Sequence, residues 1–501
     1  MKKKLSLLLL AIVSAMLLGC GQKAEETGKI VKTIDDLEGS KIGVQLGTIG
    51  DIYASDYEGD EAGTTIERYN KLADAMQALR QGKIDCVIVD EQPAIACTKG
   101  EKSLVILDEP FTLEDYAICI AKDNEELLNK VNGALEELKE DGTIEQITAN
   151  YIGDDTKGTC PYVTPEGTTY DSGKLVVATN VAFPPYEFYD KGEPVGIDME
   201  LIKAIGDKIG MDVEIEDMEF DSIINAVDSH KADLGIAGMT MTEERLKSIN
   251  FSVPYVTTKQ VIVSINPDAE GRGLGLVENF KRNFIDDDRW QYLVKGLENT
   301  IIIAVCAVFA GMFIGFLVAI VRVTFDKTGK LSLLNKICKL YLAIIRGTPI
   351  MIQLLIIFYV VFKSVNVPKL LVAIIAFAIN SGAYVAEIMR GGIMSIDDGQ
   401  MEAGRSLGLS YRQTMVSIIL PQAIKNVLPA LANEFISLIK ETSICGYIGL
   451  MDLTRGGDII RSITYEALLP LVGVAIIYLI IVQLLNLGVG KLEKNLRKSE
   501  Q

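Results

Sequence analysis

The chain has 501 residues, 49% of them hydrophobic, and carries a formal net charge of −18 at pH 7. Residues 21–266 contain 48 Asp and Glu against 22 Lys and Arg, whereas the other residues contain 19 against 27. The acidic part would repel phosphate, which argues against nucleic acid as a partner. The remainder is apolar with a basic excess, as in membrane proteins with Lys- and Arg-rich cytoplasmic loops. His230 is the only histidine and the cysteines have no CxxC spacing, so a metal site is not expected.

The first twenty residues read as a secretory signal. Three lysines precede a short apolar run that ends in small residues, "MKKKLSLLLLAIVSAMLLGC". The last four of them resemble a bacterial lipobox, which implies cleavage before Cys20 and acylation of its thiol. The alternative is an ordinary signal peptide with an incidental cysteine. We expect a signal peptide over 1–19, a lipid-anchored tether over 20–33 and export of the domain that follows.

Residues 34–153 alternate between strand-like and helix-like patterns. "KIGVQLG" (41–47) predicts a strand that runs into a glycine-containing turn. "IDCVIVD" (84–90) is a continuous apolar run bounded by acids, which is typical of a buried parallel strand. "NEELLNKVNGALEELKEDG" (124–142) predicts an amphipathic helix. After a linker rich in Gly, Thr, Pro and Asp (154–172), the alternation resumes, which predicts an α/β architecture throughout.

The second α/β segment resembles the first lobe of bacterial periplasmic-type amino acid binding proteins. The resemblance is carried by "LVVATNVAFPPYEFYD" (175–190), "VGIDMELIKAIGDKIG" (195–210) and the stretch 218–255, which ends in "SINFSVPY". The earlier segment resembles their second lobe in "DDLEGSKIGVQLGTIGD" (35–51) and "KIDCVIVDEQPA" (83–94). Residues 116–153 resemble the family's C-terminal segment, which returns to lobe one. The resemblance implies a two-lobed ectodomain that binds one polar amino acid.

The order of these pieces departs from the family, in which lobe one comes first. Here lobe two and the returning segment (34–153) precede the main part of lobe one (173–266), and each piece occurs once. The sequence therefore predicts a circular permutation in which the linker joins the old termini. The new termini would fall in the first hinge crossing, between Ile265 and Asp35. Permutation is tolerated where domain termini lie close together on the surface.

The resemblance also implies which residues bind the ligand. A zwitterion needs an anion site, and arginine holds a carboxylate bidentately through its planar guanidinium. Backbone N–H groups at a helix N-terminus add to such a site. The implied carboxylate-binding groups are the Gly238 N–H, the Thr240 hydroxyl and Arg245 on one lobe, and Thr48 and the Ile49 N–H on the other.

Other groups are implied for the rest of the amino acid. Asp90 would accept the α-ammonium, Phe183 and Phe220 would sandwich the side chain, and Asn180 and Gln45 would read its identity. Structural roles remain open for these residues. Arg245 could pair with Glu243 or Glu244, Asp90 could cap a helix, and the aromatic rings could belong to the core.

The C-terminal part predicts a membrane domain over 298–490, after a connector over 267–297 and before a cytoplasmic tail over 491–501. A spanning helix needs about 20 apolar residues. Five such runs occur, near 300–321, 341–363, 367–389, 414–439 and 466–489. Basic residues gather at 322–339, at 390–412 and at the C-terminus, which predicts that these segments are cytoplasmic. With five helices, the N-terminal side of the first then lies outside, in agreement with the signal.

The stretch "EAGRSLGLSYRQTMVSIILPQA" (402–423) resembles the cytoplasmic loop of ABC importer permeases, and "IIRGTP" (344–349) points to their polar amino acid branch. The resemblance implies a short coupling helix near 400–411 that docks on an ATPase subunit. Glu402, Ala403, Gly404 and Gly408 match the motif. The alternative is an amphipathic interfacial helix. No G-x-x-x-x-G-K-[ST] motif occurs, so ATP and Mg²⁺ would belong to the partner ATPase, with no cofactor in this chain and no enzyme activity of its own.

The function that these patterns predict is ATP-dependent uptake of a polar amino acid, glutamine- or arginine-like. Ligand capture outside the bacterial cell membrane and translocation across it would occur in one chain, working as a permease homodimer with a separate ATPase. An amino-acid-gated channel or receptor is the main alternative, because ionotropic receptors combine the same binding fold with membrane helices. An enzyme is a third possibility, since some lyases share the two-lobed fold.

Overall fold

The computed structural model describes residues 29–59, 63–99, 101–153, 156–190, 193–267, 275–362, 365 and 367–498. The expected signal peptide and Cys20 lie outside these residues. The chain divides into two compact units, Met1–Glu114 with Thr258–Leu274, and Asp115–Thr257 with Gly275–Gln501. The first unit contains lobe two. The second contains both lobe one and the helical region, whereas the sequence analysis expected the two lobes to form one domain and the helices another.

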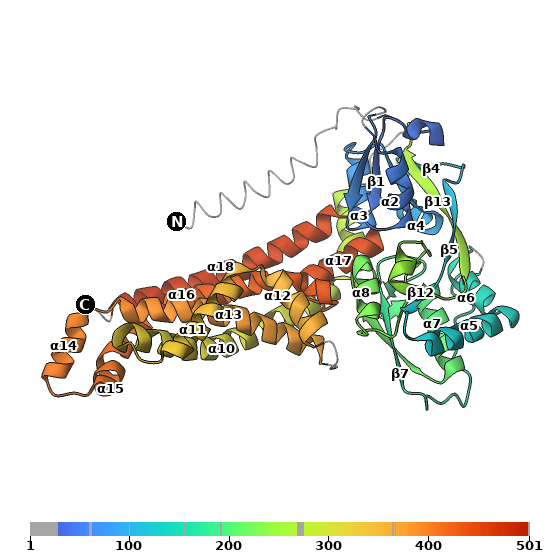
Figure 1. The fold of residues 1–501 in the computed structure, drawn as a ribbon. Helices are drawn as coiled ribbons and strands as arrows, with labels where there is room; N and C mark the ends of the chain where they lie inside the picture. The colour runs from blue at the N-terminus through green and yellow to red at the C-terminus, as the bar shows by residue number, and fades with distance from the viewer. Residues whose placement is uncertain are drawn as a thin grey trace. The chain divides into compact units, whose positions relative to one another are not determined.

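Lobe two is built on a mixed sheet with the strand order β2-β1-β3-β13-β4, and β5 pairs with β13 (Figure 1). β3 is buried along its whole length, as the apolar run predicts, and pairs parallel with β1 and antiparallel with β13. The strands are β1 (Lys41–Gln45), β2 (Thr65–Tyr69), β3 (Cys86–Asp90), β4 (Leu104–Ile106), β5 (Thr112–Tyr116) and β13 (Val256–Ile265). The helices are η1 (Ile34–Leu37), α2 (Ile49–Ala54), η2 (Ser55–Tyr57), α3 (Leu72–Arg80) and α4 (Glu91–Thr98).

The chain passes between the two units within β5 and within β13. β13 runs without a break from Val256 to Ile265, and its second half lies in the lobe-two sheet beside β3. The crossing itself is therefore intact. The break between Ile265 and Asp35 falls after it, inside the first unit, and not in the crossing as the sequence analysis expected.

Lobe one has a sheet with the order β10-β7-β11-β6-β12. β6, from the N-terminal half of the chain, lies between β11 and β12 from the other half, with Ile120 opposite Leu234 and Asn250. This pairing is the one that a permuted lobe requires. The strands are β6 (Cys119–Ala121), β7 (Lys174–Thr179), β10 (Asp212–Asp217), β11 (Leu234–Gly235) and β12 (Ile249–Phe251), with a small hairpin of β8 (Phe188–Asp190) and β9 (Glu193–Val195).

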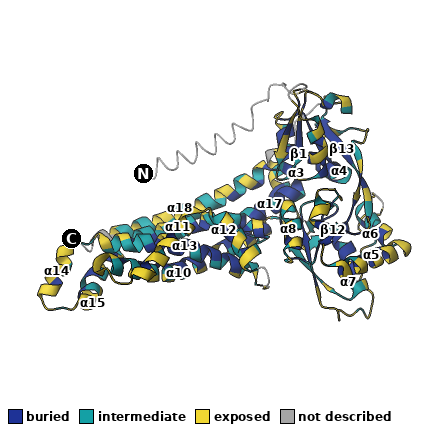
Figure 2. Ribbon diagram, viewed as in Figure 1, coloured by how far each residue is buried: buried dark blue, intermediate teal, exposed yellow. Residues whose placement is uncertain are grey.

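The lobe-one helices bury an apolar face against the sheet and expose the other (Figure 2). In α5 the predicted stripe is buried at Leu127, Val131, Leu135 and Leu138, and Asn124 caps the helix by accepting from the Leu127 N–H. The helices are α5 (Glu125–Glu140), α6 (Thr143–Tyr151), α7 (Ile197–Ile209) and α8 (Ile223–Asp228), with the 3₁₀ turns η3 (Phe220–Ser222) and η4 (Arg245–Lys247).

The linker is tied to α7. Tyr162 donates its hydroxyl to Asp207 Oδ2 at 2.9 Å, and Tyr170 donates to Oδ1 of the same carboxylate at 2.8 Å. Glu200, also on α7, accepts from the Tyr162 N–H at 2.9 Å and the Tyr151 hydroxyl at 2.8 Å. The segment that would join the old termini thus follows the surface of lobe one.

In the described part of the helical region, four helices are long and apolar enough to span a membrane, or five if one bent pair counts as a single span. The bent pair is Ser332–Gly347 with Ile350–Val361, at 109°. The helices are α9 (Leu276–Phe280), η5 (Lys281–Ile285), η6 (Asp286–Asp288), α10 (Trp290–Thr328), α11 (Ser332–Gly347), α12 (Ile350–Ile356), η7 (Ile357–Val361), α13 (Lys369–Met394), α14 (Asp398–Ser406), α15 (Tyr411–Thr414), η8 (Met415–Ile419), α16 (Leu420–Glu441), η9 (Thr442–Ile448), α17 (Leu453–Thr464) and α18 (Leu468–Lys498).

The second expected span, 341–363, is therefore broken. The break falls at Thr348 and Pro349, where proline forces the preceding residue out of the helical conformation. The carbonyls that this break leaves without helical partners accept from Gln353, whose Nε2 donates to Ile345 O at 2.7 Å and Thr348 O at 3.0 Å. Asn380 holds the same side chain by donating to Gln353 Oε1 at 3.0 Å.

Candidate functional site

Three of the predicted ligand residues of lobe one form a cluster. Arg245 donates from Nη1 to the carbonyl oxygen of Thr240 at 2.6 Å, and its guanidinium lies 5.5 Å from the centre of the Phe220 ring. The Arg245 N–H donates to the Thr242 hydroxyl, which closes the turn that leads into η4. A guanidinium fixed by a carbonyl and an aromatic face is pre-oriented for a planar anion.

Phe183 and Gly238 also lie together. Gly238 has φ +51°, and a Cβ placed on it would come within 3.1 Å of both Phe183 and Tyr116. Phe183 stacks on Tyr186 at 5.8 Å between ring centres and packs against the hydrophobic core of lobe one. The close approach of these rings to the backbone explains why only glycine fits at this position.

The Gly238 N–H, predicted to bind the ligand carboxylate, is already used inside lobe one. It donates to Asp198 Oδ2 at 2.9 Å, an oxygen that also accepts from the Tyr255 hydroxyl at 2.9 Å. Of the three carboxylate-binding groups predicted on lobe one, the Gly238 N–H is therefore engaged by Asp198 in this structure. Asp198 is fully buried at the start of α7, and sequence reasoning did not identify it.

The environment of Asp198 perturbs its titration. Burial raises the pKa of this carboxyl to about 6, although the hydrogen bonds from Gly238 and Tyr255 favour the charged form. The group that positions the Gly238 loop thus titrates well above an ordinary aspartate. Its only sequence signal was the "GID" that begins α7.

Asn180 follows β7 and is buried. Its Nδ2 donates to the carbonyl oxygen of Met218 at 2.6 Å, so this amide connects the end of β7 to the end of β10. The side chain predicted to read the ligand therefore also holds two loops of lobe one together. Its Oδ1 can accept a hydrogen bond from a ligand.

In lobe two, the predicted turn occurs where β1 ends. The Thr48 hydroxyl donates to Gln45 O at 2.7 Å, and Thr48 is the N-cap residue of α2, whose first residue is Ile49. α2 has only six residues, so any anion affinity would come from its first N–H groups more than from a long dipole. Asp51, in the same turn, accepts from the Gly47 N–H and from Arg68 Nε at 2.7 Å.

Asp90 ends β3 and is buried. It occupies the N-cap position of α4, but its side chain makes no capping hydrogen bond there. Gln260, opposite Asp90 on β13, is also buried, and within the described part of the chain its Oε1 has no hydrogen-bond partner. A Cβ on Gly50 of α2 would lie 3.3 Å from that oxygen. Sequence reasoning missed Gln260, which adds a buried acceptor to this half-site.

The predicted coupling helix is α14, which lies with α15 at the end of the helix bundle away from α17 (Figure 1). Glu402 and Ala403 are exposed on it. Gly404 faces inward, since a Cβ there would approach Thr414 Cγ2 at 2.5 Å, whereas Gly408 has φ +85° and open space around it. Gly404 is therefore packed closely against Thr414 within the chain. Leu407, 81% exposed, is the apolar side chain that the motif did not single out.

Comparison with known proteins identifies both parts. Residues 59–154 and 175–440 match the bacterial extracellular solute-binding proteins, family 3. The glutamine transport system permease protein GlnP of Escherichia coli is 37% identical over 208 residues, which cover 41% of this chain and 93% of that protein. A GlnP of Rickettsia typhi is 38% identical over 207 residues, with the same coverage. A crystal structure of an amino acid ABC transporter with histidines is 36% identical, covers 45% of this chain and 100% of that chain, and has a TM-score of 0.40.

These matches confirm the two-lobed α/β fold, the helical membrane part and the amino acid ABC transporter class that the sequence predicts. The curated relatives are permease proteins of glutamine transport systems by name. The chain belongs to the family 3 bacterial extracellular solute-binding proteins and joins this binding domain to the permease domain of an amino acid ABC transporter.

Proposed function

We propose that this chain captures a polar amino acid outside the cell, glutamine first among the candidates, and carries it across the membrane. One observation supports this above all. A single chain holds a family 3 binding domain and a stretch that aligns with 93% of a glutamine permease. Capture and translocation are then joined covalently, which raises the local concentration of receptor at the permease to about millimolar.

Both half-sites act on the same ligand in this proposal. Arg245 and Thr240 of lobe one hold the α-carboxylate, with Thr48 and the Ile49 N–H contributing from lobe two. Asp90 accepts the α-ammonium, and Phe183 and Phe220 enclose the side chain. Asn180, Gln45 and the buried Gln260 acceptor choose among side chains by hydrogen bonding.

The energy comes from a separate ABC ATPase that docks on α14, on the side of the membrane opposite to the lobes. The exposed face of α14 and the basic residues at 322–339 and 390–412 support this orientation. If α11 and α12 count as one span, the number of membrane crossings is odd. An odd number is what this orientation requires, because it places the two ends of the helical region on opposite sides of the membrane. Two ATPase subunits close symmetrically and each needs one docking helix, so we propose a homodimer of this chain.

Two measurements on the full chain test the proposal. In lipid nanodiscs, L-glutamine is titrated calorimetrically with L-arginine and L-glutamate as comparisons, and one ligand per chain is expected. Proteoliposomes are prepared with this chain and an ABC ATPase of the same transporter class. Uptake is expected only when ATP is present on the side of the membrane where the ATPase is bound. If none of the three amino acids gives a binding heat, the proposal that the chain binds a polar amino acid would be wrong. Ligand-dependent flux without ATP would favour the amino-acid-gated channel.

A further inference from the structure

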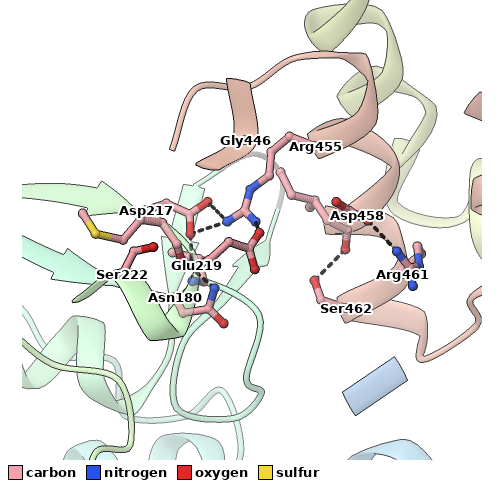
Figure 3. A network of polar contacts seen from close by, with 12 residues as sticks. Asn180, Asp217, Glu219, Ser222, Gly446, Arg455, Asp458, Arg461 and Ser462 are labelled. Atoms are coloured by element: carbon pink, nitrogen blue, oxygen red, sulfur yellow. Dashed lines mark hydrogen bonds and ion pairs between the residues drawn. The ribbon is translucent and has the colours of Figure 1, made fainter. Parts of the chain in front are cut away.

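Arg455 of α17 is an ionised side chain with only 4% of its surface exposed, and its partners belong to lobe one (Figure 3). Its Nη2 lies 2.7 Å from both carboxylate oxygens of Asp217, and its Nη1 lies 2.6 Å from Glu219 Oε1. Burial alone would lower the pKa of the guanidinium, but the two carboxylates raise it, so the group stays charged. A buried guanidinium that bonds two carboxylates through two of its nitrogens holds both partners in one geometry.

The helical region is also shaped for close approach at this place. Gly449 has φ +66°, and a Cβ on it would overlap the carbonyl oxygen of Asp217. Lys369, at the start of α13, forms an ion pair with Glu216 of β10. A larger residue at position 449 would push the end of β10 away from both basic side chains.

Apolar contacts flank the charged ones. Tyr189 of β8 packs edge-on against Tyr292 of α10, with ring centres 6.0 Å apart, and its hydroxyl donates to Asp217 Oδ2 at 3.1 Å. Tyr359 of η7 packs against the lobe-one cluster that includes Phe251 and Met239. The contact thus combines a buried arginine with aromatic side chains, which are residue types enriched in protein interfaces.

The carboxylates that hold Arg455 also hold the loops that carry candidate ligand residues. Asp217 Oδ1 accepts from the Val181 N–H at 3.0 Å, next to Asn180. Asn180 in turn donates to the carbonyl of Met218, the residue after Asp217. Glu219 directly precedes Phe220. Loosening Asp217 and Glu219 would therefore loosen both loops.

We propose that Arg455 is the docking residue with which the permease domain holds lobe one, and that through Asp217 and Glu219 it fixes the loops bearing Asn180 and Phe220. Arg455 is a positioning residue in this arrangement and touches no substrate. Its removal leaves two neighbouring carboxylates without their shared cation, which drives them apart or toward water. The inference goes beyond the proposed function and does not depend on which amino acid is transported.

Hydrogen–deuterium exchange of the full chain in lipid nanodiscs, without amino acid, tests it. Arg455→Ala is expected to raise exchange rates about fivefold or more in peptides covering 176–190 and 212–222. A factor of about five is the lower end of the coupling usually found between two sites of a protein. Arg455→Lys should give a smaller rise, because a point charge cannot bond both carboxylates as the fork does. Arg461→Ala is the matched control, since Arg461 is a buried arginine of the same helix that pairs with Asp458 at 2.6 Å.

Unchanged exchange in the two peptides with Arg455→Ala, or an equal rise with Arg461→Ala, would overturn the docking role. If Arg455→Ala also raises exchange in the membrane helices, the exchange of Glu219→Gln in the same two peptides is the deciding measurement. That substitution weakens the contact but leaves Arg455 paired with Asp217. Titrating L-glutamine into the same samples separates the two proposals. If the wild-type chain does not bind L-glutamine, the proposed substrate is wrong. The exchange measurement still tests the docking role of Arg455 in that case.

Discussion

At the scale of single residues, Arg245 carries the clearest prediction. Its guanidinium bonds the Thr240 carbonyl and lies over Phe220, and these contacts fix its orientation toward the carboxylate that we propose it binds. Removing a desolvated charge partner costs about 2–5 kcal/mol, or roughly 30- to 4,000-fold in affinity. Calorimetry on Arg245→Ala in nanodiscs should show this loss for every amino acid that the wild type binds. The exposed Lys247 of the same turn provides the control, and Lys247→Ala should bind within about threefold of wild type.

Asp198 carries a prediction about pH. Its pKa in the folded chain is about 6, above that of an unfolded aspartate. Between the two values the folded state binds more protons, so this group contributes stability that is present at low pH and is lost as pH rises through 6. The loss amounts to about 3 kcal/mol. The apparent melting temperature of the full chain, measured from pH 4 to 7.5, should fall less steeply for Asp198→Asn than for wild type. Parallel profiles would refute the assignment.

The sequence predicted most residues of the cluster around Arg245 but not the hydrogen bonds that connect them. The motif "GIAGMTMTEER" places Gly238, Thr240 and Arg245 within one turn region, and the structure keeps them together. The hydrogen bond between Gly238 and Asp198 joins residues 40 positions apart, and no local sequence pattern predicts it. Periodicity reports which side of a helix is buried, but a buried acid at a helix start looks like an ordinary first-turn acid.

At the scale of elements, the linker is more than a flexible connection. Its composition predicted a loop, but Tyr162 and Tyr170 both bond Asp207. Hydrogen bonds to a charged group are worth about 1.5–3 kcal/mol each in favourable cases, and less where they are exposed. The double variant Tyr162→Phe, Tyr170→Phe should therefore speed proteolytic cleavage within 154–172 several-fold. Tyr53→Phe, at an exposed tyrosine of lobe two, controls for the chemical change and should cleave like wild type.

The helices were predicted well where the signal is local. The stripe in α5 is buried as its spacing requires, and the apolar runs of α10, α13 and α18 contain the expected spans. The run 341–363 was predicted as one span, although Pro349 already stood inside it. Hydropathy counts apolar residues and ignores backbone geometry, so it cannot register a bend of 109°. The π-helical segments η7 and η8 likewise have no signature in the apolar pattern.

At the scale of the whole molecule, strand pairing supports the permutation. β6 (Cys119–Ala121) lies between β11 and β12 of the lobe-one sheet, although the next strand of that sheet along the chain begins only at Lys174. β13, which follows the lobe-one strands in the sequence, pairs with β3 and β4 of the lobe-two sheet. The family pieces predicted this exchange, because each piece occurs once. The ion pairs of Arg455 could not be predicted, since they join residues more than 230 positions apart and follow only from the packed fold.

The last prediction concerns coupling to the ATPase. Leu407 is 81% exposed on the turn after α14, while Gly408 adopts φ +85°, where any side chain would strain the backbone. Leu407→Asp is therefore a cleaner probe of the docking surface than a change at Gly408. In proteoliposomes, ligand-stimulated ATP hydrolysis and uptake should fall at least tenfold, because an ATPase cleft would have to desolvate the new charge, and about 1.4 kcal/mol suffices for that factor. L-glutamine binding should persist, because the substitution changes none of the residues that we propose bind the ligand. Leu113→Asp, at a leucine 70% exposed on β5, is the control and should leave hydrolysis unchanged. Wild-type uptake by Leu407→Asp would refute the assignment of α14 as the coupling helix.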